Sequence, residues 1–233
     1  SNNDLAVIFS EIPASAAAVF TTNQVCAAPV VLTKKNLNKN HQFQLVVINS
    51  GVANACTGSK GMEDAMTMSR MAAREFKLAD PTFVAVASTG VIGDFLPLEK
   101  IELGIKKART FYPHDSSSRE TARAIMTTDT FMKEKAISFF IGGHELHLAG
   151  IAKGSGMIRP NMATMLGFLL TDAAIHHASL QKALKNAVDV SFNRVTVDGD
   201  TSTNDMVLLL ANGRRGENMI DENHPEFFIF QKA

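Results

Sequence analysis

Residues 153–166 read KGSGMIRPNMATML, a glycine-rich segment that leads into an apolar run. Before this segment, Lys135 to Ile141 and Glu145 to Ala152 have strand-like patterns and are joined by Gly142-Gly143, which predicts a β-hairpin. After it, Met165 to Thr171 predicts a further strand. The glycines of the segment fit neither the dinucleotide fingerprint nor the P-loop, so their spacing does not indicate a phosphate site.

Strand-like and helix-like patterns alternate along the rest of the chain. Runs of β-branched and apolar residues predict strands at Leu5–Phe9, Ala17–Thr21, Pro29–Leu32, Leu45–Asn49, Phe83–Ser88 and Met206–Ala211. Apolar residues three or four apart predict helices over 61–78, after Pro97, from Ser117-x-x-Glu120 (a capping box) and over 179–192, with Ser179 as N-cap. This alternation predicts an α/β protein.

Composition excludes several classes of protein. The 233 residues contain 23 Lys plus Arg and 23 Asp plus Glu, and 45% are hydrophobic. A nucleic-acid-binding protein needs a basic excess and a disordered chain a charge imbalance, so we expect neither. The longest apolar run, Met206–Ala211, is far below the roughly 20 residues of a membrane span, and Ser1-Asn2-Asn3-Asp4 does not resemble a signal peptide. We therefore expect a cytoplasmic protein without membrane or nucleic-acid partners.

Metal and disulfide chemistry are not indicated. Cys26 and Cys56 are the only cysteines, too few for a disulfide framework, and we expect both thiols to be buried. His144-x-x-His147 and His176-His177 lack a carboxylate or thiol at ligand spacing, so we expect no metal site.

The acidic run 198–205 resembles a calcium loop. It lacks glycine at the sixth position and has Leu209 instead of glutamate at the twelfth. We expect a self-hydrogen-bonded turn instead.

Three positions are candidates for chemistry. Ser88-Thr89-Gly90 ends a predicted strand, and Thr127-Thr128-Asp129-Thr130 follows a predicted helix. A plain tight turn would also explain the first segment, and an ordinary helix exit the second. The chain has no G-x-S-x-G elbow, and neither cysteine has a catalytic signature. An N-terminal threonine can act as a nucleophile without a histidine as general base. If the bond before Thr164 is cut, the new α-amine, with an unperturbed pKa of about 7.7 to 8.0, acts as base toward the Thr164 hydroxyl. The small Ala163 leaves room for that cut.

Five segments in order give a specific resemblance. They are VVINSGVANACTG (46–58), STGVIG (88–93), AIMTTDT (124–130), KGSGMIRPNMATML (153–166) and SFNRVTVDGDTSTND (191–205). Together they resemble the ornithine acetyltransferases, also called glutamate N-acetyltransferases, of arginine biosynthesis. The resemblance covers nearly the whole chain. It implies an α/β fold with sheets sandwiched between helices, of the self-processed N-terminal-nucleophile type.

The resemblance also implies the roles of individual residues. The precursor cuts itself between Ala163 and Thr164, giving an α chain of residues 1–163 and a β chain that starts at 164 and is represented here to 233. Thr164 is the nucleophile, which takes acetyl from N-acetylornithine as a threonine ester and passes it to glutamate. Thr89 and Gly90 form the oxyanion hole. Thr127 and Lys153, with Thr164, bind substrate; Lys153 suits the α-carboxylate that both substrates share.

The resemblance further implies a heterotetramer of two α and two β chains, with no metal and no cofactor. It leaves open whether acetyl-CoA is a second donor. Family members are longer at both ends, and further pocket residues, an acidic residue, an asparagine and a threonine, are expected beyond Ala233. Two alternatives stay open: a self-processing aminopeptidase of similar fold, whose pattern has serine where this chain has Thr164, and an amino-acid-binding homologue without turnover.

Overall fold

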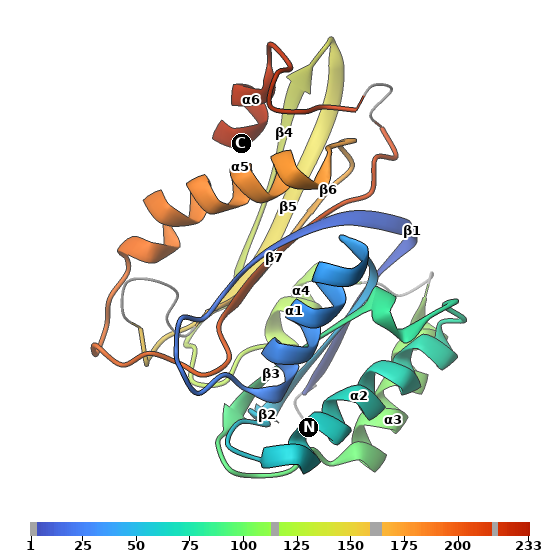
Figure 1. Cartoon of the computed structure of the whole chain (residues 1–233), viewed down its shortest axis with the longest axis vertical. Helices are drawn as coiled ribbons and strands as arrows, with labels where there is room; N and C mark the ends of the chain where they lie inside the picture. Colours follow the sequence, from blue (N-terminus) through green and yellow to red (C-terminus); the bar gives the residue numbers. More distant parts are fainter. Residues whose placement is uncertain (1–3, 113–116, 159–164, 216–218) are drawn as a thin grey trace.

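The computed structural model describes residues 4–112, 117–158, 165–215 and 219–233. In this part of the chain the strands form a seven-stranded sheet with helices packed against it (Figure 1), which confirms the α/β prediction. The strands are β1 (Leu5–Phe20), β2 (Gln42–Val52), β3 (Val84–Val91), β4 (Lys133–Ile141), β5 (His144–Lys153), β6 (Leu166–Thr171) and β7 (Met206–Ala211). The helices are α1 (Ala28–Asn40), α2 (Gly58–Glu75), α3 (Leu98–Phe111), α4 (Ser118–Ala124), α5 (His177–Val190) and α6 (Phe227–Lys232).

Strand β1 joins the two halves of the sheet. The strand order is β3-β2-β1-β7-β6-β5-β4, with parallel pairing in β2–β3 and β6–β7 and antiparallel pairing elsewhere. The first part of β1 pairs with β2 and the second part with β7, and the register is irregular between Phe9 and Ala14. Figure 1 shows β1 changing direction between these parts. The predicted strands Leu5–Phe9 and Ala17–Thr21 therefore belong to one long strand.

Three clusters of buried side chains hold the helices to the sheet. One contains Leu180, Leu184 and Phe230 of α5 and α6, against Phe139 and Val207 of the sheet. These helices cover the upper part of the molecule in Figure 1, and α2 and α3 the lower part.

The second cluster packs α2 and α3 against β2 and β3 through side chains such as Met68, Ile105 and Val47. The third contains small side chains of β1 together with Ile48 and Phe168. The terminal phenylalanines have a packing role, since Phe227 and Phe230 are buried whereas Phe228 is exposed.

Helix α1 covers the free edge of β3. The buried Thr33 hydroxyl donates to the Val86 carbonyl at 2.7 Å and accepts from the Val86 N–H at 2.9 Å, and the Asn36 amide donates to the Val84 carbonyl at 3.3 Å. Side chains of the helix thus satisfy backbone groups that an edge strand leaves unpaired.

The prediction of a strand at Pro29–Leu32 is wrong. This segment is the first turn of α1, with Pro29 near the helix start, where its missing N–H costs nothing. The β-branched Val30 and Val31 suggested a strand, but burial of Val30 and Leu32 against the core favours the helix.

Two other local predictions are also wrong. Helix α5 begins at His177 rather than Ser179, and the Ser179 hydroxyl accepts the Glu222 N–H instead of capping the helix. Cys26 and Cys56 are exposed rather than buried because they lie in the connections around α1 and before α2.

The remaining element predictions are confirmed. The β4–β5 hairpin turns at Gly142-Gly143, and Ser117 accepts the Glu120 N–H at 3.2 Å, as a capping residue does. The segment 61–78 is largely α2, and helix α3 follows Pro97. Among the helices of the described ranges, none has the length and apolar character that crossing a membrane requires.

We expect Thr33→Val to destabilise the protein. Valine keeps the shape but leaves the N–H and carbonyl of Val86 without their buried partner, which costs about 1 to 3 kcal/mol. Urea unfolding measures the change. Thr110→Val is the matched control, because the Thr110 hydroxyl is exposed at the end of α3, and its loss should change the free energy of unfolding by less than about 0.5 kcal/mol. Equal losses in the two variants would contradict the edge-covering role.

Candidate active site

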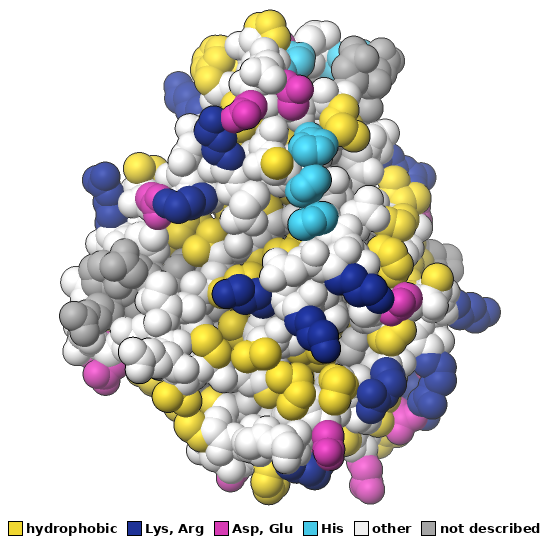
Figure 2. Space-filling view, viewed as in Figure 1, with side chains coloured by type: hydrophobic (Ala, Val, Ile, Leu, Met, Phe, Trp, Pro, Cys, Tyr) yellow, Lys and Arg dark blue, Asp and Glu magenta, His cyan; other side chains and the backbone are white. Residues whose placement is uncertain are grey.

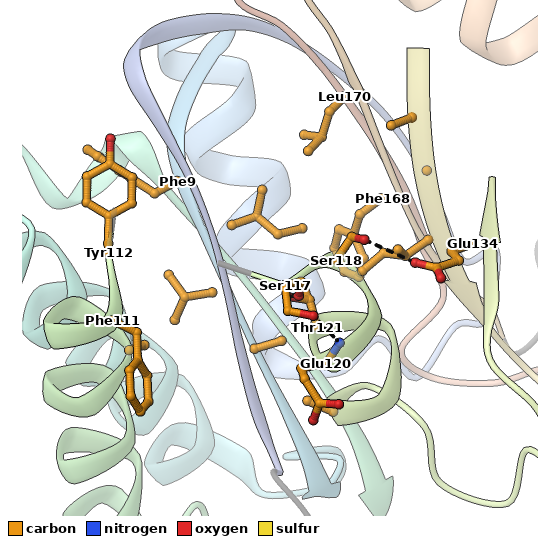
Figure 3. A pocket seen from close by; sticks show the side chains of 18 of the residues that line it. Phe9, Phe111, Tyr112, Ser117, Ser118, Glu120, Thr121, Glu134, Phe168 and Leu170 are labelled. Atoms are coloured by element: carbon orange, nitrogen blue, oxygen red, sulfur yellow. Dashed lines mark hydrogen bonds between the residues drawn. The ribbon is translucent and has the colours of Figure 1, made fainter. Parts of the chain in front are cut away.

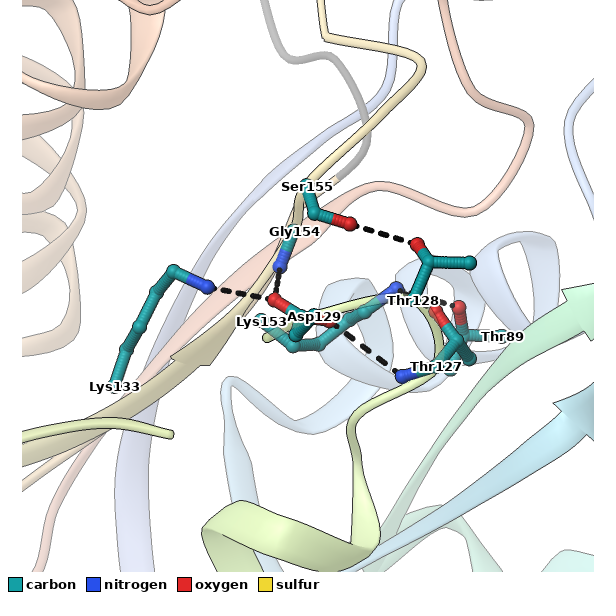
Figure 4. Close-up of polar contacts among 8 residues, drawn as sticks. All are labelled: Thr89, Thr127, Thr128, Asp129, Lys133, Lys153, Gly154 and Ser155. Carbon is teal, nitrogen blue, oxygen red and sulfur yellow. Dashed lines mark hydrogen bonds and ion pairs between the residues drawn. The ribbon is translucent and has the colours of Figure 1, made fainter. Parts of the chain in front are cut away.

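Lys153 lies where three segments distant in sequence meet. It is the last residue of β5, only 4% of it is exposed, and its ammonium donates to the hydroxyls of Thr89 in β3 and Thr127, each at 3.0 Å (Figure 4). β3 and β5 are separated by four strands in the sheet order, and the change of direction in β1 is what allows their ends to approach. The predicted site residues Thr89, Thr127 and Lys153 are therefore brought together.

The turn after α4 is tied to the end of β5. One oxygen of the Asp129 carboxylate accepts the Gly154 N–H at 2.8 Å and the Lys133 ammonium at 2.6 Å. The Thr128 and Ser155 hydroxyls are 2.7 Å apart. The side chain of Asp129 has no exposed surface, whereas Thr127 and Thr128 are exposed at the rim of the site.

A second polar network supports the end of β3. The buried Asn204 amide donates to the carbonyls of Ala53 at 2.7 Å and Ser88 at 2.9 Å. The Ser88 hydroxyl in turn donates to the Asn49 side chain at 2.5 Å. These bonds fix the backbone immediately before Thr89 and Gly90.

Asp205 ties the start of β7 to the residue that follows Thr164. Its carboxylate accepts the Met165 N–H at 2.8 Å, and only 1% of Asp205 is exposed. The sequence motif 191–205 contains Asn204 and Asp205, but nothing in its pattern assigned a role to either. Only their burial and their contacts with distant segments reveal one.

Burial and neighbouring charges shift the pKa values of this site. Burial lowers the pKa of Lys153; the negative charges of Asp129 and Asp205 oppose that effect, and the positive charge of Lys133 adds to it. Burial acts to raise the pKa of Asp129, but the bonds from Lys133 and the Gly154 N–H outweigh it, and the pKa lies below its usual value. Four charged groups thus influence one another at this site: Lys133 and Asp129 form an ion pair, Lys153 contacts the two threonine hydroxyls, and Asp205 acts on Lys153 through its charge.

Gly90 has a backbone conformation that side chains rarely adopt. Its φ is +131°, and a Cβ atom at this position would lie 2.2 Å from the carbonyl carbon of Gly51 in the neighbouring strand. Gly90 follows Thr89 directly, so the close approach of β2 and β3 sets the position of the Gly90 N–H at the edge of the site.

Ala163 and Thr164 lie outside the described residues. Asp198 accepts the Asp200 N–H at 3.3 Å, which confirms the self-hydrogen-bonded turn, and it also accepts the N–H groups of Met157 and Ile158. The Met157 N–H is the main cause that lowers the pKa of Asp198.

His41, His176 and His177 form a surface row of imidazoles (Figure 2), with the His41 and His177 centroids 4.3 Å apart. In the part of the chain that the structure describes, no three His, Cys, Asp or Glu side chains are arranged to hold a metal ion.

A groove lies elsewhere on the molecule. It has a volume of 1040 Å³ and runs over β1, β5 and β6 between the end of α3 and α4 (Figure 3). Its floor is apolar, with Phe9, Phe168 and Leu170, and at one side the Ser118 hydroxyl donates to Glu134 at 3.2 Å. It includes none of Thr89, Thr127 and Lys153. The groove and the polar cluster are therefore separate features of the surface.

Comparison with known proteins identifies the family. The model of the ArgJ family matches residues 1–233, the whole of this chain. The chain belongs to the ArgJ family.

Curated relatives in the ArgJ family are named arginine biosynthesis bifunctional protein ArgJ. The relative from Bacillus subtilis is 48% identical over 233 residues, and that from Listeria monocytogenes serotype 4b is 50% identical over 229. These matches cover 100% and 98% of this chain and 56% of each relative, so the chain spans little more than half the length of the relatives.

Solved structures agree with this assignment. ArgJ from Bacillus halodurans is 43% identical with a TM-score of 0.63, covering 69% of this chain and 83% of that one. Ornithine acetyltransferase from Mycobacterium tuberculosis, solved with ornithine, is 35% identical with a TM-score of 0.57, covering 67% and 82%. An aminopeptidase from Ochrobactrum anthropi, described as a variant of the Ntn hydrolase fold, is 15% identical with a TM-score of 0.52 over 96% of this chain and 72% of that one. The predicted fold type is confirmed.

We expect Gly90→Ala to destabilise the protein more than Gly93→Ala. Both glycines have positive φ, +131° and +96°, but only at Gly90 would the new methyl group collide with the backbone of another strand. The collision should cost about 1 to 3 kcal/mol beyond the backbone strain that the two variants share. Chemical unfolding of both variants measures the difference, and equal stabilities would show that β2 and β3 do not need to approach so closely at this point.

Proposed function

We propose that the protein carrying this chain is a self-processing glutamate N-acetyltransferase. It cleaves itself between Ala163 and Thr164, takes the acetyl group of N-acetylornithine onto Thr164, and transfers it to glutamate. The observation that carries this proposal is the buried Lys153 ammonium between the Thr89 and Thr127 hydroxyls. Membership of the ArgJ family supports it.

The direction of these hydrogen bonds suits an oxyanion hole. A lysine ammonium has three N–H donors and no acceptor, so the Thr89 and Thr127 oxygens must accept. Each hydroxyl hydrogen then remains to donate to another group. We infer that the Thr89 hydroxyl and the Gly90 N–H donate to the negative oxygen of the tetrahedral intermediate. In other enzymes, loss of one such donor costs roughly 2.7 to 4 kcal/mol of transition-state stabilisation.

Lys153 fits the part of the substrates that does not change. N-acetylornithine and glutamate share an α-carboxylate, and the described contacts use two of the three Lys153 N–H groups. We infer that the third donates to that carboxylate. Thr127, at the exposed rim beside Lys153, is in a position to contact the same group.

The chemistry runs in two balanced half-reactions. In the first, the Thr164 hydroxyl adds to the acetyl carbonyl, its proton passes through the α-amine to the leaving nitrogen, and ornithine departs from an acetyl-threonine ester. In the second, the glutamate α-amine adds to that ester, and the threonine oxygen recovers a proton. Because Thr164 supplies both nucleophile and base, we propose that no metal or bound cofactor is required, with acetyl-CoA as a second candidate donor.

The sheet supports survival of the cut protein as one unit. Strands β6 and β7, which follow Thr164, lie between β1 and β5, which precede it. Six residue pairs join β1 to β7 and six join β5 to β6. Separating the fragments would expose the buried centre of the sheet, so we propose that they stay associated. Pairing of two such heterodimers into a tetramer is part of the same proposal.

We expect Thr164→Ala to abolish both cleavage and acetyl transfer. Alanine has no hydroxyl to attack either the Ala163 carbonyl or the acetyl group. Intact-mass analysis with N-terminal sequencing should show two chains in the parent, the second starting Thr164-Met165-Leu166, and one chain in the variant. After N-acetylornithine is added, the second chain should gain about 42 Da, the mass of an acetyl group.

Thr164→Ser is the matched control and should retain cleavage and transfer at a reduced rate. A Thr164→Ala protein that is still cleaved and still transfers acetyl would contradict the proposal. Hydrolysis of peptides without acetyl transfer to glutamate would favour an aminopeptidase, and ornithine binding without an acetyl-enzyme would favour a non-catalytic homologue. Acetyl-CoA in place of N-acetylornithine tests the second donor.

We expect the KM for N-acetylornithine to rise as the pH rises through the pKa of Lys153. Only the protonated ammonium binds the carboxylate, and burial lowers this pKa, so the loss begins at a lower pH than for an ordinary lysine. Steady-state kinetics across the alkaline range test this. Lys153→Met should have a KM at least about tenfold higher and without this pH dependence, since a charged hydrogen bond contributes about 1.5 to 3 kcal/mol. Lys185→Met, which removes an exposed lysine on α5, should behave as the parent.

A further inference from the structure

Three side-chain contacts join residues 127–129 to the end of β5, and a fourth joins Asp129 to Lys133 at the start of β4. Thr127 contacts the Lys153 ammonium, Thr128 contacts Ser155, and Asp129 accepts from both Gly154 and Lys133 (Figure 4). Asp129 is the one member of this set whose charge is opposite to that of Lys153. It is also the one whose side chain reaches both β4 and the residue after Lys153.

The geometry points to Asp129 as a positioning residue for Lys153. Its carboxylate accepts the Gly154 N–H at 2.8 Å, which fixes the backbone next to Lys153, and it comes from the same turn as Thr127. Its side chain has no exposed surface, so water does not substitute for these bonds. Displacing this carboxylate would separate the Lys153 backbone from the turn that carries one of its two hydroxyl partners.

The charge of Asp129 has a second effect. The charged groups facing Lys153 are Asp129 before β4, Asp205 before β7 and Lys133 in β4; the two carboxylates raise its pKa and Lys133 lowers it. Burial alone would favour the neutral amine. Asp129 therefore fixes the backbone beside Lys153 and opposes the lowering of the Lys153 pKa by burial, and it also binds Lys133, whose positive charge acts in the other direction.

In the transfer reaction this role concerns binding rather than bond making. This inference rests on one part of the proposed function, namely that the Lys153 ammonium binds the α-carboxylate of the substrate. Asp129 contacts the lysine's neighbour and need not touch substrate, so its loss should raise KM at alkaline pH more than it lowers kcat.

The experiment compares Asp129→Asn with Lys133→Met in the protein that carries this chain. Trace labelling with acetic anhydride, followed by peptide mass spectrometry, gives the pH at which Lys153 is half-deprotonated. Asp129→Asn should lower this midpoint by about one pH unit, the lower end of the effect of a nearby opposite charge. Lys133→Met should raise it, because a positive neighbour is removed. Asp189→Asn, which removes an exposed carboxylate of α5, should leave it unchanged.

Opposite shifts in the two variants support the inference, since general loosening of the site would move both midpoints in the same direction. An unchanged midpoint in Asp129→Asn, or shifts of equal sign, would overturn it. If Asp129→Asn does not fold, Asp129→Glu replaces it, because the longer side chain keeps the charge but displaces the oxygen that accepts the Gly154 N–H. A shifted Lys153 midpoint or a raised KM for N-acetylornithine then supports the inference, and the parent values for both would overturn it. The labelling does not require the enzyme to turn over substrate. A parent protein that forms no acetyl-enzyme would contradict the proposed function, but the labelling midpoints of Lys153 would still test the role of Asp129.

Discussion

A buried ammonium group is the most demanding feature of this structure. Taking the charge of Lys153 out of water is costly unless hydrogen bonds and opposite charges compensate for it. The compensation comes from three separate segments: Thr89 in β3, Thr127 and Asp129 in the turn after α4, and Asp205 before β7. Meeting this requirement brings distant parts of the chain to one point. The geometry of the site is thus a consequence of stabilising a single charge.

The sheet makes this meeting possible through β1. A flat sheet with this strand order would hold the ends of β3 and β5 apart, because β2, β1, β7 and β6 lie between them. The irregular pairing of β1 between Phe9 and Ala14 lets its two halves run in different directions. Asn204 then bridges the start of β7 to Ala53 and Ser88 near the ends of β2 and β3. The polar network closes only because the strand bends.

Local sequence patterns predicted the elements that depend on local physics. The Gly142-Gly143 hairpin, the Ser117 capping box and the apolar face of α2 are confirmed, since each depends on neighbours within a few residues. The segment Pro29–Leu32 was wrongly predicted as a strand, because its local sequence is compatible with a strand or a helix and burial against the core favours the helix.

The candidate site divides in the same way. Family motifs selected Thr89, Thr127 and Lys153, and the structure brings these three together. The contacts of Asp129 with Gly154 and of Asp205 with Met165 span 25 and 40 residues, and no periodicity or spacing encodes them. The only indication of Asp129 and Asp205 in the sequence was that each is an acidic residue within a motif rich in small polar side chains.

The connection from β5 to β6 is anchored on both sides by contacts that do not depend on the 163–164 bond. Its ends, Lys153 and Leu166, are register partners in adjacent strands. Asp198 holds the N–H groups of Met157 and Ile158 before the proposed cut, and Asp205 holds the Met165 N–H after it. Both carboxylates come from the segment before β7, so this one segment binds the backbone on both sides of the proposed cut. Breaking the 163–164 bond would therefore release a new amine while strand pairing and these carboxylates keep its surroundings in place.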